Sequence, residues 1–175
     1  MGIKNPMLSV SVKYGLLAAF LSVVLFSLLY FFGKNPLLIP LFLDYRILIF
    51  SIFLLFGIRD FKDNKNNGIL HFWQGFVTGA IIVLLVSVIM GLFIFLLGTV
   101  IDHGFTGNYI HEMMQNITGA KEKIISEYGQ DVYDKAVKII PTTTLADLSL
   151  DYFLKTIPIG LIITILISLA FRRKE

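Results

Sequence analysis

Long uncharged stretches dominate the pattern of hydrophobic and polar positions along the chain. The first lies between Lys13 and Lys34 and contains twenty residues without a charge. A helix of about 20 residues matches the roughly 30 Å hydrocarbon core of a bilayer. Three more apolar stretches follow. The pattern therefore predicts an all-α membrane protein, a four-transmembrane-helix bundle with spans at about 12–32, 39–58, 72–101 and 150–171.

The first and third stretches are long. The apolar region of a secretory signal usually has only about 7–15 residues. The first stretch exceeds this length and ends in aromatic residues, so we expect a retained helix. The third stretch has no charged residue between Phe72 and Ile101. A helix of that length would extend about 45 Å, so this span is expected to tilt or to project beyond the lipid.

The second stretch contains charged residues. Its apolar run from Ile47 to Ile58 is too short to cross a bilayer alone. The span is therefore expected to begin near Ile39, with Pro40 in the first helical turn, where proline is tolerated. This start places Asp44 and Arg46 inside the helix, in its outer third.

The only sizeable segment outside the membrane is expected at 102–148. Apolar residues recur there at helical spacing with charged residues on the other side, which predicts one amphipathic helix over 117–140, ended by Pro141. Thr144 and Asp147 resemble a capping box that starts the last helix. The amphipathic helix either lies on the membrane surface or packs on protein, and its mixed, mildly acidic charge favours protein. The whole chain, 1–175, is expected to form a single membrane domain.

Lysine and arginine are distributed unevenly around the spans. The positive-inside rule assigns the side richer in these residues near the span ends to the cytoplasm. We therefore expect a multi-pass protein of the bacterial inner membrane with both termini in the cytoplasm. One side carries Lys4, Lys13, Arg59, Lys62, Lys65, Arg172, Arg173 and Lys174, and the other has only Lys34, Arg46 and Lys155 close to spans.

The composition agrees with this class and removes several functions. Hydrophobic residues make up 56% of the chain and charged residues 15%, whereas soluble domains average roughly 25% charged residues. The absence of cysteine excludes disulfides, thiolate metal sites and cysteine nucleophiles. The net charge of +3 is small and follows the expected topology, so no nucleic-acid partner is expected.

Asp44 and Arg46 form a candidate intramembrane polar pair. Ionisable residues within a span are costly and suggest a functional site or a buried partner. Residues two apart on a helix point to nearly opposite sides, so these two need not pair with each other. Three interpretations stay open: the side chains reach the outer interface, they form a buried ion pair with another span or subunit, or they serve transport or ligand binding.

No catalytic, cofactor-binding or metal-ligating motif stands out. His103 and His111 lie near Asp102 and Glu112, but their spacing matches no known zinc pattern. His71 is expected on the opposite side of the membrane. Asp102 and His103 with a serine or threonine could imitate a catalytic triad, but no nucleophile-elbow sequence accompanies them. We expect no metal, no cofactor and no enzymatic activity.

Small residues recur inside the spans at regular spacing. Such stripes let helix backbones approach closely in lipid. They serve either the packing of the protein's own helices or a binding face for a partner subunit. The candidate face consists of Gly75, Gly79, Ser87, Gly91, Gly98, Gly160, Thr164 and Ser168.

Several short motifs resemble a known set of small membrane proteins. They are Lys4-Asn5-Pro6, Lys13-Tyr14-Gly15, Phe56-Gly57-Ile58-Arg59-Asp60 and the stretch from Asn67 to Phe76. Together with an acid- and lysine-rich segment before the last span, they are similar to the domain-of-unknown-function 4199 family of Bacteroidota inner-membrane proteins. The resemblance implies four spans, no established activity and no agreed catalytic residues. Genes of this family often lie beside a family-two glycosyltransferase, which implies work on envelope glycans or glycolipids.

Three function hypotheses of different classes follow. The first is a non-enzymatic membrane subunit that self-associates or that binds and positions a partner membrane protein, such as an envelope glycosyltransferase. The second is a small transporter or lipid-handling protein in which Asp44 and Arg46 face a polar cavity. The third, a membrane-embedded enzyme, requires His103, His111 and the nearby acids to converge in one pocket.

Overall fold

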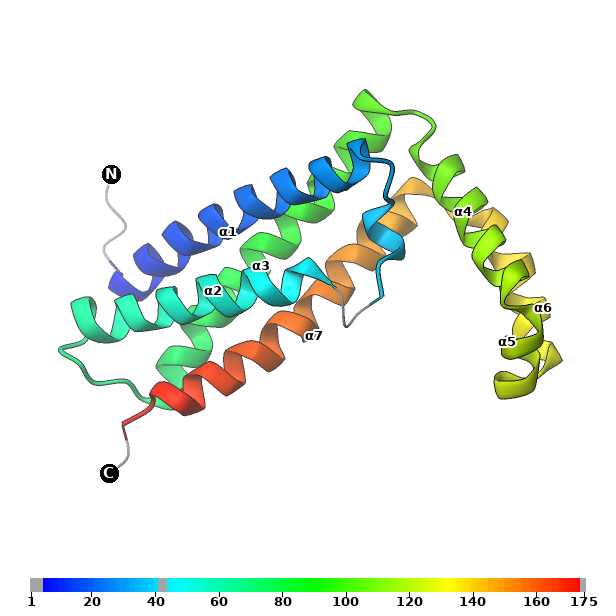
Figure 1. Cartoon of the computed structure of the whole chain (residues 1–175). Helices are drawn as coiled ribbons and strands as arrows, with labels where there is room; N and C mark the ends of the chain where they lie inside the picture. Colours follow the sequence, from blue (N-terminus) through cyan, green and yellow to red (C-terminus); the bar gives the residue numbers. More distant parts are fainter. Residues whose placement is uncertain (1–4, 41–43, 174–175) are drawn as a thin grey trace.

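The residues that the computed structural model describes, 5–40 and 44–173, form helices joined by turns and short extended segments, with no strand among them. Four helices lie along one another and are here called the helical body (Figure 1). They are α1 (Pro6–Phe31), α2 (Tyr45–Asp60), α3 (Phe72–Leu96) and α7 (Leu145–Phe171). The most extensive contact is between α3 and α7, followed by that between α1 and α3.

Three of these helices are long and apolar enough to cross a membrane: α1, α7, and α3 with the π-helical turn that extends it to Ile101. This is compatible with a multi-pass membrane protein. In contrast, α2 has 16 residues, which rise about 24 Å, less than the roughly 30 Å of a hydrocarbon core. A fourth span therefore stays a prediction.

The second helix begins later than the sequence suggested. Ile39 is extended, with φ −68° and ψ 129°, because the ring of the following Pro40 disfavours a helical conformation there. The helix starts only after Asp44, whose side chain caps it by accepting from the Arg46 N–H at 2.9 Å. The expected start near Ile39, with Pro40 in a first turn and Asp44 inside the helix, is therefore wrong. Residues 41–43 lie outside the described ranges.

The first and last helices of the helical body, α1 and α7, both begin before the apolar stretches that predicted them. α1 starts at Pro6, where Asn5 accepts from the Met7 N–H at 3.0 Å. α7 starts at Leu145 in the predicted capping box, which is confirmed: Thr144 N–H donates to Asp147 at 2.8 Å, and Asp147 N–H returns a bond to Thr144 at 3.2 Å. The first turns of these helices contain polar residues, so the apolar pattern does not include them. The predicted spans therefore begin several residues too late.

The segment after α3 contains three helices, where one long helix over 117–140 was predicted. They are α4 (Phe105–Gly119), α5 (Lys121–Tyr128) and α6 (Gln130–Ile139). Gly129 separates the last two with φ +91°, a left-handed conformation that glycine adopts without a steric penalty. The prediction of a single helix is therefore wrong. The chain reverses at Gly129, and α6 packs back on α5 and α4, so that the α4–α6 hairpin extends sideways from the helical body (Figure 1).

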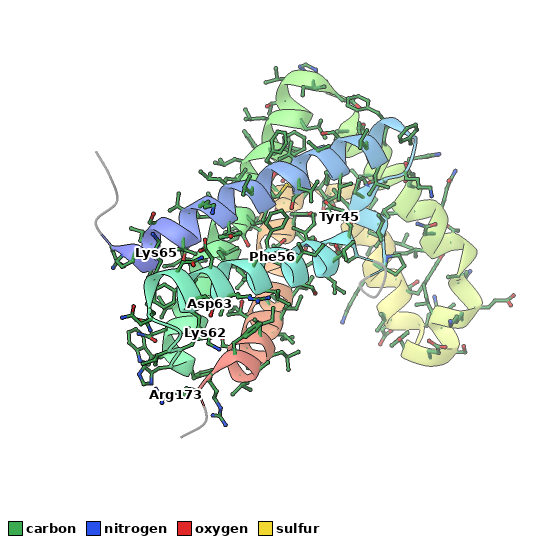
Figure 2. The ribbon with its side chains drawn as sticks, turned by 60° about the vertical axis from the view of Figure 1, so that its left-hand side comes forward. Tyr45, Phe56, Lys62, Asp63, Lys65 and Arg173 are labelled. Carbon is green, nitrogen blue, oxygen red and sulfur yellow. The ribbon has the colours of Figure 1, made fainter. Side chains whose placement is uncertain are left out.

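Basic residues gather at the end of the body opposite the hairpin, where α1 begins and α7 ends. Figure 2 shows Lys62, Lys65 and Arg173 at this end together with Asp63. The Arg173 N–H donates to the carbonyl of Leu70 at 3.0 Å, which joins the end of α7 to the start of α3. We call this the basic end. Lys4 and Lys174, which the sequence also assigned to it, lie outside the described residues.

Substituting Gly79 tests the close packing of α3 against α7. A Cβ atom at Gly79 would lie 2.4 Å from Thr164 Cγ2, and Thr164 is short and branched, so it has little room to yield. We expect Gly79→Ala to destabilise the protein by about 1–3 kcal/mol, measured as a lower thermal midpoint in mild detergent. Gly107→Ala is the matched control, because nothing lies within 4 Å of a Cβ there. Equal midpoints for both variants would contradict this packing.

Candidate functional site

Asp44 and Arg46 form a buried ion pair near the start of α2. Asp44 precedes the helix, so its carboxylate folds back over the first turn and accepts from Arg46 Nε at 2.7 Å and from Arg46 Nη2. The argument that the two need not pair with each other assumed that both were helical; Asp44 precedes the helix, and the two residues do pair. Both side chains are buried, so they do not extend to an exposed interface.

Side chains of α7 complete the environment of the arginine. Arg46 Nη1 donates to Thr156 Oγ1 at 2.8 Å, and the guanidinium carbon lies 4.3 Å from the centre of the Tyr152 ring. The Tyr152 hydroxyl is 2.7 Å from the hydroxyl of Tyr45, the first residue of α2. Sequence reasoning missed these partners. The available signal was the spacing of Tyr152 and Thr156, four residues apart on one face of α7.

A pocket of about 380 Å³ adjoins the ion pair. It lies between α2, α7 and the short 3₁₀ turn η1 (Pro36–Leu38), and its walls are mainly apolar. The lining residues are Leu37, Ile39, Asp44, Arg46, Lys155, Pro158, Ile159 and Ile162.

The position of this site along α7 indicates its depth. Thr156 and Phe171 are fifteen residues apart on α7, a rise of about 22 Å. If Phe171 marks one boundary of a hydrocarbon core roughly 30 Å thick, the ion pair lies in the part of the core nearer the hairpin. Charged groups at such a depth need partners that keep them from lipid, and both side chains of this pair are buried.

The histidines that sequence analysis considered do not form a common centre. Within residues 5–40 and 44–173, no three His, Asp or Glu side chains gather in a way that could hold a metal ion. His111 instead lies 3.0 Å from the amide nitrogen of Gln115 on its own helix. Asp102 accepts from the Tyr30 hydroxyl and from the Gly104 N–H. These donors favour the ionised carboxylate and hold the pKa of Asp102 below its usual range.

The comparisons with known proteins give one match. A family model described as "Protein of unknown function (DUF4199)" matches residues 13–173, nearly the whole chain. The chain belongs to this family. The matched range contains the ion pair, the pocket and the α4–α6 hairpin of this DUF4199 protein. Neither the curated proteins nor the solved structures yielded a match.

The small residues of this DUF4199 protein contact its own helices. A Cβ atom at Gly75 would meet Ser168, one at Gly79 would meet Thr164, and one at Gly160 would meet Val83 at 2.5 Å. Most of the remaining members follow the same pattern: Gly91 lies against Phe153 and Ser149, and Gly98 lies against Leu145. Ser87 is buried and donates to the Val83 carbonyl. The stripe therefore lies largely inside the helical body rather than on an open face.

Removing one member of the ion pair should destabilise the protein more than removing both charges. Arg46→Met would leave the buried Asp44 carboxylate without its cation, which costs about 3–5 kcal/mol. Combining it with Asp44→Asn, which keeps a helix-capping side chain, should recover much of that loss. Thermal midpoints of both variants in mild detergent or nanodiscs measure the difference. A single variant as stable as the wild type would show that water already screens these charges.

Proposed function

We propose that this DUF4199 protein is a non-enzymatic subunit of the bacterial inner membrane that binds or positions another membrane protein. The main support for this proposal is the apolar surface of the α4–α6 hairpin. Neither α5 nor α6 has a buried residue, while Tyr128 is 67% exposed and Ile139 64% exposed. Large apolar side chains held away from the helical body are typical of a surface that meets another component.

The charge of the hairpin supports a protein partner over a lipid surface. Helices that lie on a membrane are usually rich in lysine and arginine on their polar face. Here acidic residues interleave with the lysines on α5 and α6, including Glu122, Glu127, Asp131 and Asp134. The family resemblance supports an envelope glycosyltransferase as the partner.

We further propose that α2 is a fourth span and that both termini are cytoplasmic. The described residues before α2, 34–40, would contribute to the crossing that α2 is too short to make alone. Irregular backbone is tolerated at membrane depth where protein covers it, and Asn35 and Pro36 in this segment are buried. The basic end then faces the cytoplasm, in keeping with the positive-inside rule.

Single cysteines test this orientation, since the chain has none of its own. We expect Arg173→Cys at the basic end to resist a membrane-impermeant maleimide added to intact spheroplasts, and Ser126→Cys on α5 to react. After lysis both should react, which controls for accessibility. Labelling of Arg173→Cys from outside would overturn the proposed topology.

Site-specific crosslinking tests the proposed partner. A photoreactive amino acid at Tyr128 should give a discrete adduct with a second membrane protein in cells of the native host. The matched control is Phe20, an exposed position on α1, where only lipid contact is expected. Val132→Asp should abolish the Tyr128 adduct while leaving the free energy of unfolding within about 1 kcal/mol of wild type, because Val132 is exposed. An identical pattern at both positions, together with isolation as a lone monomer, would contradict the proposal.

A second candidate function, a small lipid-handling protein, is favoured by the pocket beside Arg46. A transporter of ions or polar solutes would need free charges in a polar cavity. The charges of Asp44 and Arg46 instead bond to each other, and the pocket walls are mainly apolar. This arrangement suits an amphiphile better than a polar solute.

A further inference from the structure

We propose that the pocket between α2, α7 and η1 is a lateral binding site for a lipid with a phosphate headgroup. This deepens the second proposed function and rests on the same pocket. Apolar walls provide for an acyl chain, and two cations at one end provide for the phosphate.

The pocket opens toward the place where lipid tails lie. Pro158 and Ile162 line it and are exposed on the surface of the helical body, Ile162 by 60%. Both belong to an apolar helix long enough to span a membrane. Leu37, Ile39 and Ile159 continue the apolar wall inward. An acyl chain could therefore enter from the side without passing through water.

At the polar end of the pocket, the arginine is buried and held in a fixed orientation by its neighbours. The Arg46 side chain is only 9% exposed, and Asp44, Thr156 and the Tyr152 ring fix its guanidinium in place. Among the described residues, the bonds to Asp44 and Thr156 use three of its five N–H groups. Two remain for a further acceptor, and phosphate oxygens suit the planar geometry of a guanidinium.

The net charge of the lining favours an anion. Arg46 and Lys155 contribute two positive charges, and Asp44 contributes the one negative charge among the lining residues. The oxygens of Asp44 already accept from Arg46, so the carboxylate holds the arginine in place. Lys155 pairs with Asp151 one turn away at 2.6 Å, but both side chains are exposed, and such a pair is weak. Lys155 can therefore turn toward a phosphate at the membrane boundary.

Lipid binding to the full-length protein tests this site. Native mass spectrometry of the detergent-purified chain, titrated with phosphatidic acid or phosphatidylcholine, gives the apparent affinity for each lipid. We expect wild type to prefer phosphatidic acid, and Lys155→Gln to lose about fivefold in affinity for it. Lys34→Gln, an exposed lysine at the same end of the body, is the matched control and should change little. Ile162→Trp, at an exposed wall position, should weaken binding of the acyl chain.

Three results would overturn the proposal. These are equal affinity of wild type for the two lipids, an effect of Lys155→Gln no larger than that of Lys34→Gln, and full displacement of phosphatidic acid by millimolar inorganic phosphate. The last result would indicate a site for a free anion without a requirement for the acyl chain. A separate assay of lipid transfer between leaflets of reconstituted vesicles tests the second proposed function. Binding without transfer would contradict the lipid-handling function but would still support the lipid-binding site.

Discussion

The close approach of α3 and α7 is the constraint on which the rest of the structure depends. Lipid tails are as apolar as leucine, so helices in a membrane gain little from hiding hydrophobic side chains against each other. Tight backbone contact and well-matched surfaces must supply the attraction. Gly75, Gly79 and Gly160 allow it, because a β-carbon at any of them would collide with the facing helix. With α7 fixed against α3 in this way, Tyr152 and Thr156, which continue the buried stripe of Gly160 toward the start of α7, are placed beside α2.

The buried ion pair illustrates how an unfavourable group is accommodated. An arginine in a hydrocarbon layer is costly, yet Arg46 has a carboxylate, a hydroxyl and an aromatic ring around it. Only one of these partners is local in sequence. The other two come from α7, so the orientation of α7 and the protection of Arg46 depend on each other.

The sequence predicted the long helices well because twenty uncharged residues leave few alternatives to a span. It also predicted the cap at Thr144 and Asp147, whose spacing is diagnostic. It failed at Gly129, where Tyr128 and Val132 keep helical spacing across a chain reversal, so the hairpin looked like one helix. The start of α2 was predicted too early because Pro40 was taken as part of the first helical turn, whereas the residue before it is extended and the helix begins only after Asp44. Thr156 could not be paired with Arg46 from sequence, because contacts between distant segments leave no local pattern.

The separation between Arg46 and Thr156 has a consequence for how the protein is made. The two residues lie 110 positions apart, so at about 5–20 residues per second the ribosome needs roughly 5–20 s to deliver the second after the first. If α2 is a fourth span, as proposed above, it would enter the membrane during that interval without the two partners of Arg46 on α7. Asp44 emerges almost at the same moment and can neutralise Arg46 at once. A partner only two residues away would thus compensate the charge of Arg46 in the nascent chain until α7 has been synthesised.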